Sequence, residues 1–353
     1  MSDLSGNRRG MGERRQTPPL RRAGMREVAE RAGVAISSVS RVISDHPDVS
    51  DKMRERVLAA IDELGFQPDA LAQSLRTGES FTIGFVAADI GNPLLAQIAM
   101  GAERVLRQRG YSMLVANSFN EPGLALEQLR SMEQRRIDGL LISVSDENDE
   151  ALNKALDSAH YPITLIDREI AATSASAVLS DHAQGIRAAV EHLISLGHRS
   201  IALVNGSSQV RPSRERAETL AAVASEYPNV VSTIRMGDFS AEHGYSATIE
   251  LMSAADAPTA LIAGSNQILV GVLRALRELM LDIPGDVSLV TCDDVALSEF
   301  LTPAISTISR DPAEIGRTAA ELVLAQLGGA ESEEAHLPTG FRTTDSCGTP
   351  RQK

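Results

Sequence analysis

The side chains in this sequence that could do metal or covalent chemistry are few and widely separated. The two cysteines, Cys292 and Cys347, have no Cys or His partners at the spacing of a zinc site, and they make no disulfide framework. His182, His192 and His198 do not share a helical face, so we expect exposed or capping positions for them. We therefore expect neither a metal ion nor a cofactor.

The neighbouring carboxylates of Asp293 and Asp294 are of the type that does general acid and base catalysis. Adjacent residues at a strand end point to opposite sides, however, and no histidine accompanies this pair. No Gly-x-Gly-x-x-Gly or Walker-type loop follows any predicted strand, so neither a dinucleotide nor ATP is indicated. The sequence predicts that the protein is not an enzyme.

Charge is distributed unevenly along the chain. The total of 34 basic and 47 acidic residues gives a net charge of -13, which taken alone counts against a nucleic-acid partner. Residues 1–42, however, hold nine arginines against four acidic residues, whereas residues 81–353 hold 21 basic and 35 acidic residues. This asymmetry indicates that the amino-terminal end meets a polyanion, the alternative being a solvated tail.

The apolar runs are too short to cross a membrane. They extend over about ten residues or fewer, whereas a membrane-spanning helix needs about 20. The arginine pairs near the start, such as Arg8 with Arg9, are not followed by the apolar segment of a secretory signal. We expect a cytoplasmic protein with no membrane partner.

From residue 81 onward, apolar β-type runs alternate with amphipathic helical patterns. The runs cover residues 83–87, 113–116, 140–144, 163–166, 201–204, 230–235, 260–263 and 287–291. Such alternation is typical of parallel sheets covered by helices on both faces, and the spacing favours two doubly wound subdomains over one large sheet. The predicted class is α/β, with a ligand site where the two sheets face each other.

The segment before this body has the pattern of two short helices that cross at a tight turn. Ala29 is small enough for the helices to approach, and Gly33 can take the positive φ of the turn. Val28, Val39 and Val42 would form a small shared core. This spacing predicts a helix-turn-helix that binds DNA.

The second helix of the motif would turn short polar and apolar side chains outward. Ile36, Ser37, Ser38 and Arg41 lie at positions from which they can reach base edges in a major groove, and arginine can pair with guanine. A third helix is expected to begin after Ser50, whose hydroxyl would cap it.

Several later segments form an ordered series with this motif. Residues 26–43 read REVAERAGVAISSVSRVI, and they are followed by VSDKMRERVLAAIDELGFQPDALAQSLR, TIGFVAADIGNP, RRIDGLLI, HLISLGHRSIAL, RALREL, IPGDVSLV and LTPAISTI. Over residues 25–347 this series resembles the LacI/GalR (lactose/galactose repressor) family of bacterial transcription regulators. The combination is more specific than the helix-turn-helix alone.

The resemblance implies a body like the periplasmic sugar-binding proteins, which dimerises and controls the DNA-binding headpiece through a hinge. The expected parts are a disordered basic tail (1–24), a headpiece (25–66), a hinge helix and linker (67–80), and an effector-binding and dimerisation domain (81–353), whose subdomains are about 81–180 with 310–336 and 181–309 with 337–347. The implied function is a ligand-responsive, sequence-specific transcription regulator, a repressor acting as a homodimer on a near-palindromic double-stranded operator. The alternative is a sugar-binding protein that only binds its solute.

The resemblance also assigns DNA contacts in the hinge. Leu75 occupies the position of the leucine that enters the minor groove and wedges open a base step. Three positions depart from the family pattern. Gly24 and Ala35 replace the Ser or Thr that often caps each helix of the motif, and Gln73 stands where many members carry arginine.

The effector positions implied by the resemblance are spread along the body. They are Leu94, Leu95, Arg168, Arg216, Phe239, Ser265, Asn266 and Asp293. An arginine fork and a carboxylate can each hold adjacent hydroxyls, and an aromatic face can cover a ring, so the set favours a small polar ligand such as a sugar. The alternative is that Arg216 and Asp293 form a structural ion pair or cap helices and that Phe239 belongs to the core.

Overall fold

The computed structural model describes residues 23–43, 46–66, 79–170, 174–294 and 301–351. The chain divides into two compact units, Met1–Gly78 and Glu79–Lys353. Within the described part of the chain, no helix is both long and apolar enough to cross a membrane. We call residues 25–66 the headpiece and the second unit the body.

The headpiece contains helices α1 (Met25–Ala32), α2 (Ile36–Ile43) and α3 (Asp51–Leu64) around a small apolar core. Val28, Val39 and Val57 are fully buried in this core. Gly33 ends α1 with a φ of 63°, and the amide of the next residue returns to the carbonyl of Ala29. The predicted turn and the predicted valine core are therefore confirmed.

The body consists of two six-stranded sheets. The strands are β1 (Thr82–Ala87), β2 (Ser112–Asn117), β3 (Gly139–Ile142), β4 (Ile163–Ile166), β5 (Ser176–Ser180), β6 (Ser200–Asn205), β7 (Val231–Met236), β8 (Ala260–Ala263), β9 (Ser288–Cys292), β10 (Ser306–Ser309), β11 (Glu334–Leu337) and β12 (Gly340–Arg342). Their orders are β11-β5-β4-β3-β1-β2 and β12-β10-β9-β8-β6-β7. All paired strands are parallel except β12, which runs antiparallel to β10. The predicted α/β class with two doubly wound subdomains is confirmed.

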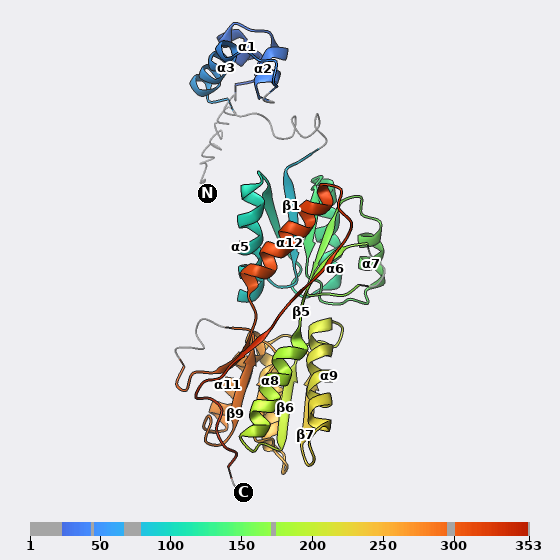
Figure 1. The fold of residues 1–353 in the computed structure, drawn as a ribbon, viewed down its shortest axis with the longest axis vertical. Coiled ribbons are helices and arrows are strands. Elements are labelled where there is room, and N and C mark those ends of the chain that lie inside the picture. Colours follow the sequence, from blue (N-terminus) through green and yellow to red (C-terminus); the bar gives the residue numbers. More distant parts are fainter. Residues whose placement is uncertain (1–22, 44–45, 67–78, 171–173, 295–300, 352–353) are drawn as a thin grey trace, which may run out of the picture. The chain divides into compact units, whose positions relative to one another are not determined.

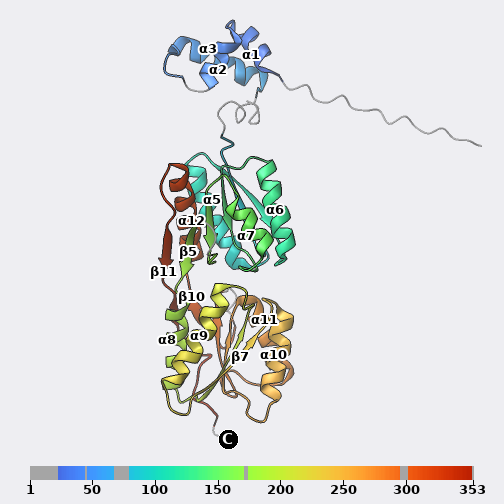
Figure 2. The same cartoon turned by 90° about the vertical axis from the view of Figure 1, so that its right-hand side faces the viewer.

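Helices cover both faces of each sheet, as Figures 1 and 2 show. They are α5 (Pro93–Gln108), α6 (Pro122–Gln134), α7 (Glu150–Asp157), α8 (His182–Ser195), α9 (Arg211–Ser225), α10 (Ala241–Ser253), α11 (Asn266–Glu278) and α12 (Pro312–Leu327). In the first subdomain α5 and α12 pack on one face of the sheet, and α6 and α7 on the other. In the second, α8 and α9 lie on one face, and α10 and α11 on the other. Each sheet is therefore buried on both sides, as its continuous apolar strands require.

Three connections pass between the subdomains. They join β5 to α8, β10 to α12, and β11 to β12. Because the strands of each sheet are parallel, their carboxyl ends meet at one edge, and in both subdomains the loops from this edge line a common cleft.

The strands that the sequence pattern missed are β5, β10, β11 and β12. They are short, and polar residues such as Ser176, Ser306 and Glu334 begin them, so they do not stand out as apolar runs. Each lies near one edge of its sheet, next to a connection between the subdomains. These strands join the two halves, and tertiary pairing rather than local composition places them.

Candidate DNA-reading helix and effector cleft

The outward face of α2 is the candidate DNA-reading surface. Ile36, Ser37 and Arg41 are exposed and Ser38 is partly exposed, whereas Val39 is fully buried against α1 and α3. The predicted orientation is confirmed, while contact with DNA stays a prediction. Leu75 and Gln73 lie outside the described residues.

Both ends of α1 in the headpiece make hydrogen bonds with charged side chains and not with a capping hydroxyl. Glu27 Oε2 accepts a hydrogen bond from the Gly24 amide at 2.6 Å. Glu27 is also the acidic residue in the first turn of α1, where negative charge is favourable. Arg56 of α3 donates to the carbonyls of Ala32 and Gly33, at 2.5 and 3.1 Å, and so completes the end of α1. The expectation that the Ser50 hydroxyl caps α3 was wrong, since that side chain makes no capping hydrogen bond.

The cleft of the body is nearly filled by its own side chains. Its free volume is about 60 Å³, whereas pockets for small ligands usually enclose roughly 300–1,000 Å³. The lining includes most of the predicted effector positions, namely Leu94, Leu95, Arg168, Arg216, Phe239, Ser265 and Asp293. Asn266 is not in the lining, but its side chain donates to Asn92 Oδ1 across the cleft at 3.0 Å. The fold thus gathers the predicted positions at one place.

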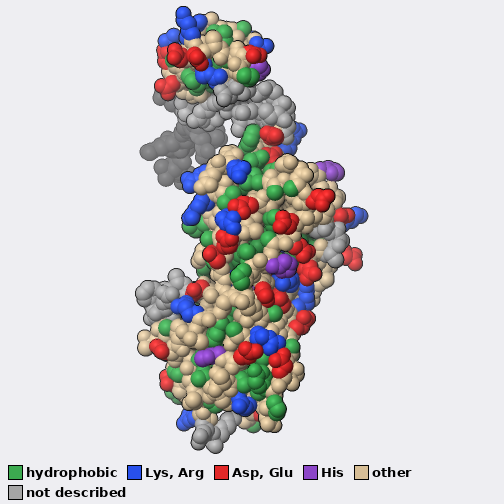
Figure 3. Space-filling model, viewed as in Figure 1, with side chains coloured by type: hydrophobic (Ala, Val, Ile, Leu, Met, Phe, Trp, Pro, Cys, Tyr) green, Lys and Arg blue, Asp and Glu red, His purple; other side chains and the backbone are tan. Residues whose placement is uncertain are grey.

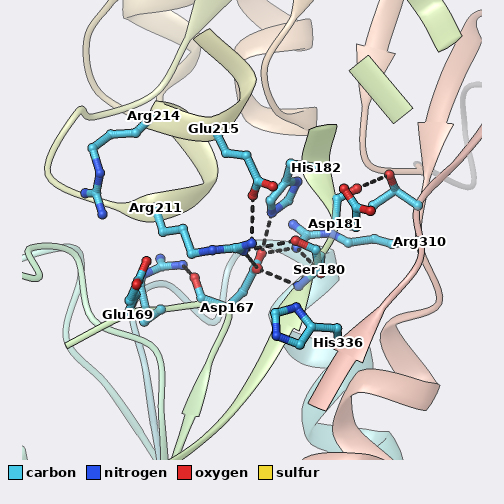
Figure 4. A network of polar contacts seen from close by, with 12 residues as sticks. Asp167, Glu169, Ser180, Asp181, His182, Arg211, Arg214, Glu215, Arg310 and His336 are labelled. Carbon is cyan, nitrogen blue, oxygen red and sulfur yellow. Dashed lines mark hydrogen bonds and ion pairs between the residues drawn. The ribbon is translucent and has the colours of Figure 1, made fainter. Parts of the chain in front are cut away.

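Asp167 is the centre of a buried polar network in this cleft (Figure 4). Its Oδ2 accepts from His182 Nε2 at 2.9 Å and from Arg310, and its Oδ1 accepts from the Ser180 amide at 3.1 Å. Arg211 of α9 approaches the same carboxylate, at 3.5 Å. Burial alone would raise the pKa of Asp167, but His182 and Arg310 hold it well below its usual range. The group is therefore a carboxylate at neutral pH.

Arg310 connects this network to the second sheet. It lies between β10 and α12, and its Nε donates to Asp293 Oδ1 at 2.7 Å while its Nη1 donates to Asp167. Burial would lower the pKa of Arg310, but the two carboxylates raise it, so both ion pairs persist. One guanidinium thus links a carboxylate that follows β4 to a carboxylate that follows β9.

Both of these aspartates have a left-handed backbone, with φ of 53° for Asp167 and 69° for Asp293. Asp adopts this conformation more readily than most residues because its short side chain can bond locally. Each residue directly follows its strand, so the sharp turn directs each carboxylate into the cleft. Asp294, by contrast, pairs with Arg342 outside the cleft at 3.1 Å, which confirms that the two neighbouring acids point apart.

Further contacts cross the cleft and hold its sides together. Arg214 of α9 pairs with buried Glu147 at 2.6 Å, and the same carboxylate accepts from the Arg211 amide at 2.9 Å. On the opposite side, Gln267 donates to Asp89 at 2.8 Å. The described cleft is therefore in a closed arrangement.

The other two buried arginines of the lining are held by backbone carbonyls. Arg168 donates to the carbonyls of Val144 and Asp167, and Arg216 donates through Nη1 to the carbonyl of Gly264 at 2.8 Å. The alternative of an ion pair between Arg216 and Asp293 is not observed as a direct contact. Phe239 packs at the edge of a core cluster and also lines the cavity, so core and cleft are both part of its surroundings.

The sequence interpretation missed Asp167, His182, Arg211 and Arg310. His182 was expected to be exposed or capping, but its side chain is only 2% exposed and contacts Asp167. His198 is also buried, with its ring nitrogens bonded to Thr259, Ser288 and Gly348. The available signal was position, and only for Asp167: it follows the predicted strand at 163–166, whereas Arg310 follows β10, which the pattern missed.

A pH-dependent loss of stability should arise from His182. The pKa of His182 is lowered from about 6.5 to about 4. Burial is the main cause, and Arg216 and Arg310 lower the pKa further, whereas Asp167 raises it. The unfolded chain therefore takes up the proton first, and stability decreases as pH falls from about 6.5 to 4, by roughly 3 kcal/mol. Unfolding midpoints measured across this range should depend less on pH in His182→Asn.

The control for this prediction is His160→Gln, because His160 is exposed. That variant should keep the full pH dependence, to which buried His198 also contributes because its pKa is lowered by burial. An unchanged slope in His182→Asn would contradict the prediction.

Comparisons with known proteins agree with this geometry. Residues 24–69 match the bacterial regulatory proteins of the lacI family, and residues 190–347 match a periplasmic binding protein-like domain. The chain is 31% identical to the HTH-type transcriptional repressor PurR of Klebsiella pneumoniae (strain 342), over 89% of this chain and 93% of the relative. It is 32% identical to PurR of Escherichia coli O139:H28, over 86% of this chain and 90% of that relative.

Among solved structures, the chain is similar to the Lac repressor dimer bound to operator and the anti-inducer ONPF. The TM-score is 0.82 with 28% identity, over 93% of this chain and all (100%) of that one. The chain is also similar to a complex of the transcriptional regulator CelR with cellobiose. The TM-score is 0.68 with 28% identity, over 92% of this chain and all (100%) of that one. Because relatives above 30% identity match over most of both chains, this protein belongs to the lacI family of bacterial regulatory proteins.

Proposed function

We propose that this DNA-binding regulator is a cytoplasmic repressor that acts as a homodimer on a near-palindromic operator. Its operator affinity is controlled by a small polar effector that binds in the cleft of the body. The observation that carries the proposal is the convergence of the lining residues from both sheets on one closed, polar cleft. A ligand held there contacts both subdomains and therefore favours one arrangement of the two.

The effector contacts in this proposal are the lining side chains that face the cavity. They are Leu94, Leu95, Arg168, Arg216, Phe239, Ser265 and Asp293, with Asn266 beside them. Guanidinium and carboxylate groups give directed hydrogen bonds, and the apolar members contact the remaining surface of the ligand. The relative CelR, solved as a complex with cellobiose, supports a ligand in a body of this fold.

The DNA contacts in this proposal are limited to the amino-terminal end. Ile36, Ser37, Ser38 and Arg41 read the major groove, and Leu75 enters the minor groove. On the face of the body seen in Figure 3, acidic and basic side chains are intermixed rather than gathered into a basic patch. Such a surface gives phosphate little attraction.

Selection of bound fragments from genomic DNA tests the proposal. The full chain should enrich a symmetric motif. Arg41→Ala should weaken binding and relax selection at one base pair, since a bidentate arginine contact contributes about 1–3 kcal/mol of discrimination. Leu75→Ala should weaken binding to the motif through loss of the wedge. Failure of the full chain to enrich any motif would favour the alternative of a solute-binding protein.

A matched control for Leu75→Ala is available in α3. Leu58 is 51% exposed and belongs to neither proposed DNA-reading element. Leu58→Ala should enrich the same motif as the unmodified protein. If this variant loses the motif as fully as Leu75→Ala, the loss cannot be assigned to minor-groove contact.

A further inference from the structure

One lip of the cleft is closed by a loop of the first subdomain that contacts the segment before α9 in the second. The backbone amide of Glu147 donates to the carbonyl of Gln209 at 3.0 Å, and the side chain of Asn148 donates to Gln209 Oε1 at 2.9 Å. We call residues 145–148 and 209–214 the Glu147 lip. The three connections between the subdomains lie elsewhere, since β3 is separated from β5 by β4, and β6 from β10 by β8 and β9. Non-covalent contacts therefore decide whether this lip opens.

The carboxylate of Glu147 is buried and receives three hydrogen bonds. Its Oε2 accepts from Arg214 at 2.6 Å, and its Oε1 accepts from the amides of Arg211 at 2.9 Å and Glu169 at 3.2 Å. The side chain is only 2% exposed, so these donors replace the water that the group has lost. Hydrogen bonds to a carboxylate are stronger than those between neutral groups. Two of the three donors lie on α9, in the other subdomain.

Helix α9 has no capping side chain of its own. Its N-cap residue is Val210, whose apolar side chain accepts no hydrogen bond, and its second residue is Pro212, which has no amide proton. The amide of Arg211 is therefore the first in the helix that requires an acceptor, and Glu147 provides it from the opposite subdomain. Negative charge is also favourable at this end of a helix. The first turn of α9 is thus completed only while the lip is closed.

This first turn carries groups that belong to the cleft. Arg211 donates to the carbonyl of Ser180 at 2.9 Å and approaches Asp167, and Figure 4 shows its side chain extending towards both. Pro212 lines the cavity itself, whereas Glu147 lies outside its described lining. Any influence of Glu147 on the effector site therefore passes through the position of α9.

The opposite lip, residues 89–95 and 265–268, is joined by weaker contacts. Gln267 donates to Asp89 at 2.8 Å, and Asn266 donates to Asn92 at 3.0 Å. Asp89 is the one charged residue in these two bonds, and it is partly exposed. Hydrogen bonds between neutral groups contribute less to stability than those to charged groups. Closure of the cleft should therefore depend more on the Glu147 lip.

We propose that Glu147 is a positioning residue for the effector site, which caps α9 from the opposite subdomain and thereby holds the cleft closed. This proposal rests on the proposed function, since it concerns access of the effector to the same cleft. The free volume of about 60 Å³ is well below the usual size of a ligand pocket, so the lips must separate before an effector enters. Release of the Glu147 carboxylate from α9 is then a step of effector binding.

Hydrogen–deuterium exchange of the full chain, followed by mass spectrometry, tests the proposal without ligand or DNA. Glu147→Ala should speed the exchange of residues 209–214 by about tenfold or more, because it removes hydrogen bonds to a charged group. Exchange should also become faster at residues 89–95 and 265–268, because the opposite lip opens with the cleft. The amides of β6 should keep their rate, since the core of the second sheet is unchanged.

The matched control is Glu226→Ala. Glu226 follows the other end of α9 and pairs with Arg187 of the same subdomain at 2.8 Å, so its loss should leave both lips unchanged. Glu147→Gln keeps an acceptor oxygen for the Arg211 amide but loses the ion pair, and its effect should be smaller than that of Glu147→Ala. If faster exchange in β6 shows that Glu147→Ala unfolds the body, Glu147→Gln and Glu226→Gln are compared by the same criterion.

The outcomes separate closure of the cleft from local capping and from the function. Faster exchange at both lips in the Glu147 variants alone supports the proposal. A change confined to residues 209–214 would overturn it, because Glu147 would then only cap a helix, and so would equal acceleration by the Glu226 variants. Failure of the full chain to enrich a DNA motif rejects the proposed function instead, while the exchange result still decides whether Glu147 closes the cleft.

Discussion

Asp167→Ala should lower the free energy of unfolding of the body by about 3–5 kcal/mol, the expected cost of breaking a buried ion pair by removing one partner. The substitution leaves Arg310 and His182 without their shared acceptor and also removes the acceptor of the Ser180 amide. Because Arg310 then binds only Asp293, the link between β4 and β9 is lost as well. Calorimetric unfolding of the full chain measures this change in the transition of the body.

The matched control for this prediction is Asp294→Ala. Asp294 is 45% exposed and pairs with Arg342 on the surface, so its loss should cost at most about 1 kcal/mol. Equal destabilisation by both variants would show that the buried network contributes no more than a surface ion pair. Asp167→Asn keeps an acceptor oxygen but removes the charge. If this variant retains most of the stability that Asp167→Ala loses, hydrogen bonding contributes more to the stability of the network than charge pairing does.

Val39→Asp should abolish operator binding, with a loss of affinity of more than about 100-fold, corresponding to roughly 3 kcal/mol. Val39 is fully buried where α2 meets α1 and α3, and the headpiece has only a small core. A domain of this size has little stability to lose, and burial of an unpaired carboxylate costs several kcal/mol. The headpiece should therefore unfold, and electrophoretic mobility shift with the selected motif measures the loss.

The control for Val39→Asp must add the same charge without burying it. Ala59 is exposed on α3 and lies outside the core, so Ala59→Asp adds the same charge to the headpiece but leaves the core intact. It should weaken binding only modestly. Both variants should keep the unfolding midpoint of the body, which forms a separate unit. Strong operator binding by Val39→Asp would contradict the assignment of α2 to the core of the headpiece.

The local features of the fold could be predicted from the sequence because they depend on periodicity. The alternation along α2 placed Val39 inside and Ile36 outside, and the structure has both in those places. The apolar runs of β1 and β6 likewise predict strands that are covered on both faces, since such a strand needs apolar side chains on both. In each case the residues that determine the result lie within a few positions of one another.

The cleft network could be predicted only in part because its partners are distant in the chain. Arg310 and Asp167 are 143 positions apart, and no local pattern marks an arginine that will bind two carboxylates from different sheets. The resemblance supplied Arg216 and Asp293 as ligand positions, but it did not indicate that Arg310 would form an ion pair with Asp293. The pairing of Arg310 with both carboxylates therefore follows from the arrangement of the side chains and not from the motifs.

The first sheet of the body is completed by residues near the end of the chain. Strand β11 (Glu334–Leu337) pairs with β5, and α12 buries Ile315, Ala319 and Val323 against the same sheet. During synthesis, the first subdomain therefore cannot finish folding until about residue 337 has left the ribosome, whereas the contiguous headpiece can fold as soon as it emerges. A nascent chain can thus carry a folded DNA-binding unit before any cleft exists to control it.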